Sequence, residues 1–176
     1  MHDQTFLNEY FQTVWSPRTD SSMYSSYQNI AKKIPKEYWV LDVGCGGNPL
    51  HNLLPHVIGI DPANNNADFH VTIEDFIPPH LFDVACCLGS INFGDHSVIK
   101  RQIEKVVSCL KPTAQVFWRL NPGRNDHDSQ LCKNIDFYPW THAKLELFAR
   151  QYGFQQTNDQ VEMNGSRLRL YAEWSR

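Results

Sequence analysis

Five short apolar runs, each bounded by turn residues, constrain the fold of this chain more than any other feature. They are YWVLDVG (38–44), HVIGID (56–61), DFHVTI (68–73), FDVACCL (82–88) and QVFWRL (115–120). Runs of this length without a clear polar face are typical of strands buried on both sides, as in a parallel sheet. The sequence therefore predicts a mainly parallel sheet that is covered by helices.

Segments with helical periodicity lie before, between and after these runs. The clearest follows the fourth run, where aliphatic residues recur at helical spacing until Pro112, which is predicted to stop the helix. The predicted helices are Thr5–Trp15, Ser21–Ile34, the segment between Asp95 and Pro112, and His142–Tyr152 with Gly153 as its C-terminal cap.

The tail of the chain, residues 154–174, carries two alternating runs around Asn164-Gly165, a dipeptide typical of hairpin turns. The fold class that follows is α/β: a Rossmann-like, doubly wound, mostly parallel sheet with a C-terminal antiparallel hairpin strand and N-terminal helices. At 176 residues we expect a single domain, with a helical cover over 1–36 and a sheet core over 37–176. Residues 121–140 are predicted to form a long surface loop.

Composition narrows the functional classes. A net charge of -3 and a pI near 6.2 disfavour nucleic acid as a partner without excluding it. The five cysteines form no Cys-x-x-Cys pair and the histidines have no ligand spacing, so we expect reduced thiols and no metal. No run is long enough to cross a bilayer and the first residues do not resemble a signal peptide, which predicts a cytoplasmic protein without a membrane partner.

The turn after the first run reads DVGCGG (42–47) and is the strongest functional signal. About twenty residues beyond Asp42, Asp61 ends the second run, where nucleoside-binding sheets place an acid on the ribose hydroxyls. Pro49 stands where a dinucleotide fingerprint needs a third glycine, and the turn has no lysine for a phosphate loop. Asp42 would repel a phosphate and attract an ammonium. Unless the turn is only structural, its ligand is a nucleoside with a positive charge nearby.

The segment Val40–Gly46 resembles the first motif of class I S-adenosylmethionine-dependent methyltransferases, and the resemblance extends to about Gly123. It implies S-adenosylmethionine as cofactor and S-adenosylhomocysteine as product, with no metal. It also implies that Asp61 holds the ribose and that the 72–75 segment contacts the adenine, although Thr72 replaces the usual acid. The implied cofactor residues are Asp42, Gly44, Cys45, Gly46, Asp61, Thr72, Ile73, Glu74, Asp75 and Leu88.

A narrower resemblance is carried by LGSINFGD (88–95), RLNPG (119–123) and DFYPWT (136–141). These segments resemble small methyltransferase-domain proteins encoded by tailed bacteriophages, which would place the protein in the host cytoplasm. The resemblance does not identify a substrate.

Residues that face the transferred methyl group are expected where the fourth and fifth runs end, at Ser90, Asn92, Arg119 and Asn121. The catalytic candidates are Asn92 for an acceptor amine, Arg119 for an acceptor carboxylate or phosphate, and His127 as a base. The structural alternatives are a turn residue, an ion pair and a solvated loop, respectively. Tyr138 and Trp140 are expected either to stack on a planar acceptor or to pack the loop onto the core.

Two other functions remain open: cleavage of S-adenosylmethionine without an acceptor, and a non-catalytic subunit that only binds it. The methyl acceptor is not identified by the sequence, and a small molecule, a nucleotide or an exposed polymer end all fit so short a chain.

The connections Pro49–Leu54 and Pro62–Phe69 are too short for full helices, so one face of the sheet should be thinly covered. This exposed face suggests a homodimer. Alternatively, the two N-terminal helices could close over the cofactor with their aromatic residues Phe6, Tyr10, Trp15, Tyr24 and Tyr27.

Overall fold

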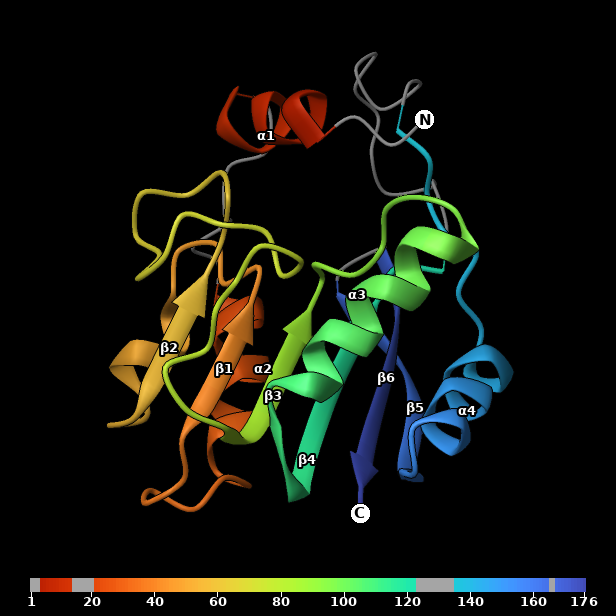
Figure 1. Ribbon diagram of the computed structural model, residues 1–176. Helices are drawn as coiled ribbons and strands as arrows, with labels where there is room; N and C mark the ends of the chain where they lie inside the picture. The colour runs from red at the N-terminus through yellow and green to blue at the C-terminus, as the bar shows by residue number, and fades with distance from the viewer. Residues whose placement is uncertain (1–3, 14–20, 123–134, 165–166) are drawn as a thin grey trace.

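The computed structural model describes residues 4–13, 21–122, 135–164 and 167–176. They contain a six-stranded sheet with the order β2-β1-β3-β4-β6-β5 (Figure 1). β2, β1, β3 and β4 are parallel, and β6 runs antiparallel to β4 and β5. The predicted α/β fold class with an antiparallel hairpin is therefore confirmed. The strands are β1 Val40–Val43, β2 Val57–Ile60, β3 Phe82–Leu88, β4 Leu110–Leu120, β5 Gln155–Asn164 and β6 Arg167–Ser175.

Helices cover both faces of this sheet. α3 and α4 pack on one face, whereas α2 and the short 3-10 helix η1 pack on the other. α1 lies apart from both layers, beyond the edge at which the parallel strands end, here called the carboxyl edge (Figure 1). None of the helices in the described ranges could cross a membrane. The helices are α1 Gln4–Thr13, α2 Ser21–Ala31, η1 Pro49–Asn52, α3 His96–Ser108 and α4 His142–Gln151.

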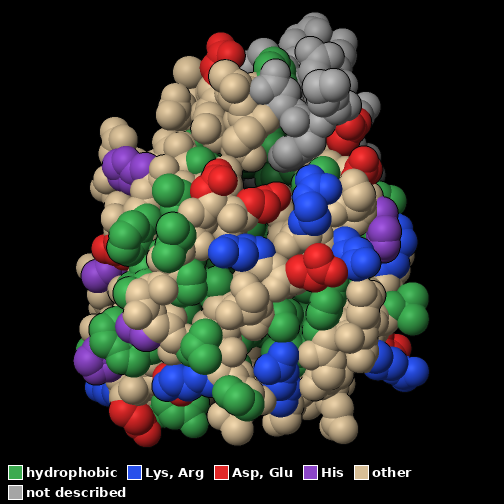
Figure 2. Space-filling view, viewed as in Figure 1, with side chains coloured by type: hydrophobic (Ala, Val, Ile, Leu, Met, Phe, Trp, Pro, Cys, Tyr) green, Lys and Arg blue, Asp and Glu red, His purple; other side chains and the backbone are tan. Residues whose placement is uncertain are grey.

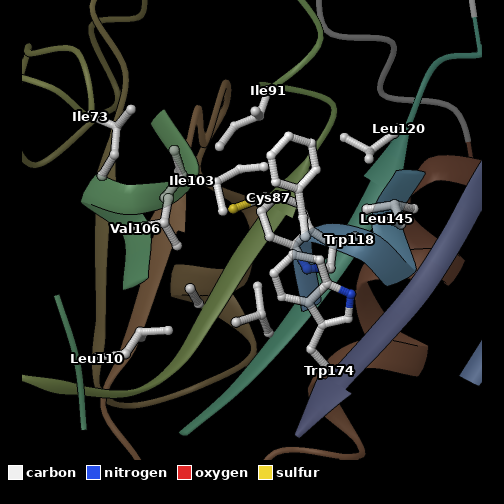
Figure 3. Close-up of a cluster of buried hydrophobic side chains, with 14 of the residues drawn as sticks. Ile73, Cys87, Ile91, Ile103, Val106, Leu110, Trp118, Leu120, Leu145 and Trp174 are labelled. Carbon is white, nitrogen blue, oxygen red and sulfur yellow. The ribbon is translucent and has the colours of Figure 1, made fainter. Parts of the chain in front are cut away.

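The larger core lies between the sheet and the α3 and α4 helices (Figure 3). At its centre the indole rings of Trp118 in β4 and Trp174 in β6 lie 4.6 Å apart between centroids. Ile103 and Val106 reach this core from α3, and Leu145 reaches it from α4. This packing holds β4 and β6 in the sheet and thereby positions the carboxyl end of β4 at the carboxyl edge.

The prediction that Pro112 stops the α3 helix was wrong. The helix begins after Asp95, whose carboxylate accepts the Ser97 and Val98 backbone N–H groups, and it ends at Ser108. Pro112 instead lies inside β4. There the register with β3 jumps from Phe82↔Leu110 to Val84↔Gln115, so the residues between are not paired regularly. Such an irregularity tolerates a residue that has no N–H to donate.

The prediction of a strand over 68–73 was also wrong. Only Phe69 pairs with the sheet, through a single parallel bridge to Ile60. The reason is that Asp68 occupies the edge of β2: its carboxylate accepts the Gly59 N–H at 2.7 Å, and its own N–H donates to the Gly59 carbonyl at 2.9 Å. With these groups already bonded, the following residues leave the sheet and turn at 73–75.

The C-terminal elements agree with the predictions. α4 ends at Gln151, and Gly153 takes a φ of +73°, the left-handed conformation expected of a glycine cap.

Residues 121–140, predicted to form a surface loop, differ from that prediction where the structure describes them. The Gly94 N–H donates to the Asp136 carbonyl at 2.7 Å, and the side chains of Ile135, Tyr138 and Trp140 are buried. Residues 135–140 are therefore part of the packed molecule.

Candidate functional site

The glycine turn after β1 is held close to the strands on both sides. Gly44 has a φ of +66°, and its N–H donates to the Ile60 carbonyl of β2 at 2.7 Å. On the other side, a Cβ on Gly44 would lie 2.2 Å from the Ser90 Cβ. Neither the conformation nor the space admits a side chain. The turn thus brings bare backbone to the carboxyl edge between β2 and β3.

Asp42 is buried beneath this turn without a compensating partner. It is 1% exposed, and its Oδ2 atom accepts no hydrogen bond. Burial, together with the nearby charge of Asp61, raises the pKa of Asp42 to about 8. A buried acid with an open oxygen fits a cationic ligand group, since a cation would supply both the missing hydrogen bond and the missing charge.

Asp61 crosses from the end of β2 to the glycine turn. Its Oδ2 accepts the Gly46 N–H at 3.0 Å, while its Oδ1 accepts the N–H groups of Ala63 at 2.8 Å and Asn64 at 3.1 Å. A carboxylate has about four acceptor positions, so capacity remains after these three bonds. The acid expected at the ribose is therefore fixed in orientation, next to the turn.

Asn92 joins the ends of β3 and β4. It is fully buried; its Nδ2 donates to the Gly89 carbonyl at 2.7 Å, and its Oδ1 accepts the Asn121 N–H at 2.9 Å. The Asn92 carbonyl also accepts the Tyr138 N–H at 2.8 Å. These bonds match the turn role considered as the structural alternative. The neighbouring Ser90 Oγ is buried and has no hydrogen-bond partner.

Arg119 is buried near the end of β4, on the α2 side of the sheet. Its Nη1 donates to Ser26 Oγ of α2 at 3.0 Å. Its Nε lies 3.3 Å from Glu162 Oε2 of β5, which is ion-pair distance, but Nε donates no hydrogen bond. The ion pair considered as the structural alternative is present, and part of the guanidinium remains open.

Solved structures share this whole architecture. No protein-family model and no curated protein matches the sequence. The N-methyltransferase NodS from Bradyrhizobium japonicum, in complex with S-adenosylhomocysteine, is 13% identical with a TM-score of 0.75, and the match covers 99% of each chain. The magnesium protoporphyrin IX methyltransferase from Synechocystis with bound SAM is 13% identical with a TM-score of 0.74, covering 100% of this chain and 98% of that one. The fold is that of class I methyltransferases.

A third structure with this methyltransferase fold also holds a methyl acceptor. It is the 1,6-didemethyltoxoflavin-N1-methyltransferase from Burkholderia thailandensis with 1,6-didemethyltoxoflavin and S-adenosylhomocysteine, 14% identical with a TM-score of 0.74, covering 98% of this chain and 85% of that chain. At such identities the likeness shows the fold. What this chain binds has to be argued from its own residues.

Several residues expected to hold the cofactor come together in this methyltransferase fold. Asp42, Gly44, Gly46 and Asp61 meet at the turn through the contacts given above. Cys45 contributes its backbone, whose N–H donates to the Ile60 carbonyl at 3.1 Å. Its thiol is buried, and burial raises the pKa of Cys45 above the usual range, so the thiol is not a nucleophile.

The residues expected at the adenine form a separate turn. Thr72 Oγ1 donates to Asp75 Oδ2 at 2.8 Å and accepts the Asp75 N–H at 3.3 Å, so these two side chains bind each other. Ile73 is buried in the larger core, and Glu74 is exposed. Leu88 is half-buried at the end of β3, against the core on the α2 side.

The remaining candidates are two buried aromatic residues and a charged segment that lies outside the described residues. Trp140 donates its indole N–H to the Ile91 carbonyl at 2.8 Å, and the Tyr138 hydroxyl lies 3.0 Å from His96 Nδ1, so both aromatic rings pack the loop onto the core. His127 and its charged neighbours at 124, 126 and 128 lie outside the described residues. No group of three or more metal-ligating side chains occurs in the described ranges.

α2 contributes Tyr27 and Ser26 to the site; the sequence suggested Tyr27 as a residue that could close over the cofactor, but not Ser26. Tyr27 is buried close enough to Asp42 and Arg119 for both charges to influence its pKa, and Ser26 bonds to Arg119. The spacing of Tyr27, Ile30 and Ile34 could have indicated a buried helix face. No signal in the sequence marks Ser26.

Proposed function

We propose that this protein is an S-adenosylmethionine-dependent methyltransferase. The observation that carries the proposal is Asp42, a buried acid with an unpartnered oxygen directly before a glycine turn. The ionised carboxylate would repel a phosphate-bearing cofactor, whereas the ammonium of a methionine moiety would stabilise that carboxylate and favour its ionisation. The methyltransferase fold, observed in complexes with the cofactor or its product, supports the proposal.

The described residues fit this cofactor at two groups. Asp42 would hold the ammonium, and the remaining acceptor capacity of Asp61 suits a ribose hydroxyl. When bound, the sulfonium supplies an activated methyl group, so the chain needs no covalent residue. What remains for the protein is to orient the acceptor at the carboxyl edge and to exclude water.

Asn92 contributes to that edge as a positioning residue in this proposal. Because both ends of its amide are bonded to backbone, it fixes the turn after β3 relative to the end of β4. The Ser90 hydroxyl, buried and without a hydrogen-bond partner, lies in that turn beside Gly44. His127 stays a predicted base.

The surroundings favour a small, neutral or cationic acceptor over a polynucleotide. Figure 2 shows acidic side chains just below α1, with Lys and Arg side chains close beside them. Glu9 lies on α1, and Asp61, Asp95 and Asp136 follow β2, β3 and β4 at the carboxyl edge. α1 itself contacts this edge through an apolar cluster, in which Leu7 and Tyr10 pack against Phe93 and Ile135. An apolar contact at this edge, together with a net charge of -3, gives the protein no overall attraction for a phosphate backbone.

Thermal denaturation with four ligands tests the proposal. S-adenosylmethionine and S-adenosylhomocysteine should each stabilise the folded chain, by about 2.7 kcal/mol at a hundred times the dissociation constant. At a pH above 8, where Asp42 is ionised, NADH and ATP should not, because the carboxylate opposes a phosphate. Stabilisation by NADH or ATP alone, or by no ligand, would contradict the proposal.

A second assay separates methyl transfer from cleavage of the cofactor. The protein is incubated with S-adenosylmethionine alone and the products are separated by chromatography. The proposal predicts no accumulation of 5'-methylthioadenosine, and transfer of tritiated methyl groups once an acceptor is added. Rapid formation of 5'-methylthioadenosine without an acceptor would identify a cleaving enzyme instead.

A further inference from the structure

Two opposite charges are buried on the α2 side of the sheet, on either side of β3. Asp42 in β1 is paired with Cys86, which is paired with Phe117 in β4. Arg119 lies two residues beyond Phe117, so it faces the same side, nearer the carboxyl edge. With strands about 4.8 Å apart and a rise of about 3.3 Å per residue, the two Cα atoms are separated by roughly 12 Å.

α2 bridges these two residues. Tyr27 of α2 is buried, and burial raises the pKa of its hydroxyl well above the usual range; Asp42 raises it further and Arg119 lowers it. The next residue back, Ser26, accepts the hydrogen bond from Arg119. Both charged groups therefore lie close to the same turn of α2, Asp42 near Tyr27 and Arg119 near Tyr27 and Ser26.

Each of the two charged groups has an open atom. Asp42 Oδ2 accepts no hydrogen bond, and Arg119 Nε donates none although it lies 3.3 Å from Glu162 Oε2; both residues are more than nine-tenths buried. A guanidinium has five N–H donors, and the Ser26 bond uses one of them. A buried anion and a buried cation with unused bonding capacity complement a ligand that carries an ammonium and a carboxylate on one carbon.

We propose that Arg119 binds the α-carboxylate of the methionine moiety of S-adenosylmethionine, while Asp42 binds its ammonium. This inference rests on the proposed function and moves Arg119 from the acceptor, where the sequence analysis placed it, to the cofactor. Its neighbourhood decides the assignment, since Arg119 lies on the same side of the sheet as Asp42 and against the same helix. Glu162 of β5 and Ser26 of α2 both contact the guanidinium and orient it.

Calorimetry with two ligands tests the assignment. S-adenosylhomocysteine carries the carboxylate, and its decarboxylated analogue lacks only that group. Wild-type protein should bind S-adenosylhomocysteine about 10- to 100-fold more tightly than the analogue, as expected for a charged hydrogen-bonding pair. Arg119→Gln should lose this preference: its affinity for S-adenosylhomocysteine falls by that factor, and its affinity for the analogue stays within about threefold.

Two further variants make the test specific. Arg119→Lys keeps the charge and should retain part of the preference, and it replaces the Gln variant if that one does not fold. Arg150→Gln changes an exposed arginine on α4, on the opposite face of the sheet, whose Nη2 donates to Glu146, and should leave both affinities unchanged. Circular dichroism of each variant checks that it is folded.

The outcomes are distinct. Equal weakening of both ligands by Arg119→Gln would mean that Arg119 only supports α2 and β5, and no change with either ligand would return it to the acceptor; both results overturn the inference. If the wild type binds S-adenosylhomocysteine but does not prefer it to the analogue, the inference fails and the proposed function stands. If the wild type binds neither, both fail.

Discussion

Two polar clusters lie on the same side of the sheet and are built in opposite ways. In the first, Glu173 of β6 accepts hydrogen bonds from Lys33, from the Tyr171 hydroxyl and from Asn158 Nδ2 at 3.1 Å. Burial raises the pKa of Glu173, but these bonds outweigh it, so the pKa lies below its usual value. In the second, Asp42 has no such donors, and burial raises its pKa to about 8.

The difference shows which cluster is complete without a ligand. The Glu173 cluster ties the end of α2 to β6 and has no role left for another molecule. Asp42 keeps an unbonded oxygen in a fully buried position, an arrangement that destabilises the folded chain unless a ligand completes it. Binding sites commonly give up stability in this way, and the contrast can be tested at each of its parts.

The largest effect is expected at the glycine turn. Gly44→Ala should abolish binding of S-adenosylhomocysteine and destabilise the protein. A left-handed alanine costs about 1–2 kcal/mol, and the 2.2 Å approach to the Ser90 Cβ adds overpacking of typically about 1–3 kcal/mol. Urea denaturation gives the change in the free energy of unfolding, and calorimetry gives the affinity.

Gly47→Ala is the matched control within the same turn. A Cβ on Gly47 meets nothing within 4 Å, so we expect stability and binding to stay close to the wild type. A double variant, Gly44→Ala with Ser90→Gly, should recover part of the lost stability because it removes the colliding Cβ atom. If Gly44→Ala behaves like Gly47→Ala, the turn is not as closely packed as described.

The next effect in size concerns Asp42. Asp42→Asn should weaken binding of S-adenosylhomocysteine at least about tenfold, because the ammonium loses its anionic partner. The same variant should be more stable than the wild type without ligand, by on the order of 1–3 kcal/mol at pH 8, since an uncompensated buried charge is removed. Calorimetry and thermal denaturation measure the two changes, which run in opposite directions.

The stability advantage of Asp42→Asn over the wild type should depend on pH. Between the unfolded pKa of 3.8 and the folded pKa of about 8, the folded chain holds a proton on Asp42 that the unfolded chain releases. The contribution of Asp42 to stability is therefore present below pH 4 and is lost as the pH rises to 8. The advantage of Asp42→Asn should grow over this range. An advantage that does not change with pH would contradict the raised pKa.

Asp83→Asn is a control in which the change in stability should have the opposite sign to that of Asp42→Asn. The Asp83 carboxylate accepts hydrogen bonds from Lys111 Nζ at 2.8 and 2.9 Å and from the Trp39 N–H at 3.0 Å. Burial raises the pKa of Asp83, but these partners lower it overall, so the carboxylate stabilises the fold above pH 4. The substitution should therefore destabilise the protein and leave binding unchanged, because Asp83 lies at the start of β3, away from the carboxyl edge.

The glycine turn could be predicted from sequence because its features are local. The left-handed Gly44 and Gly46 and the acid at the end of β2 all depend on backbone conformation near their own positions. Parallel pairing of β1 with β2 then brings Asp61 to Gly46 without further information. The fold class was predictable for the same reason, since each strand and helix carries its own periodicity.

The remaining site residues could not be predicted, because contacts distant in sequence decide their roles. Whether Arg119 is free depends on Ser26 and Glu162, which lie far from it along the chain. The expected strand at 68–73 failed because the Asp68 side chain occupies the β2 edge, a contact with no sequence signature. Tyr138 and Trp140 were named with two alternatives, and only the tertiary packing distinguishes them.

The smallest effect is expected in the complete cluster, at its exposed member. Lys33→Met removes the ammonium that donates to Glu173, but the Lys33 side chain is 44% exposed, so the ion pair should contribute no more than about 1 kcal/mol. The loss should diminish below the pKa of Glu173, where the carboxylate is protonated, and in high salt. Binding of S-adenosylhomocysteine should not change, because Tyr171 and Asn158 still hold Glu173 in place. If Lys33→Met weakened binding as strongly as Asp42→Asn, the two clusters would be one coupled unit, and the distinction between a complete structural cluster and one completed by a ligand would be wrong.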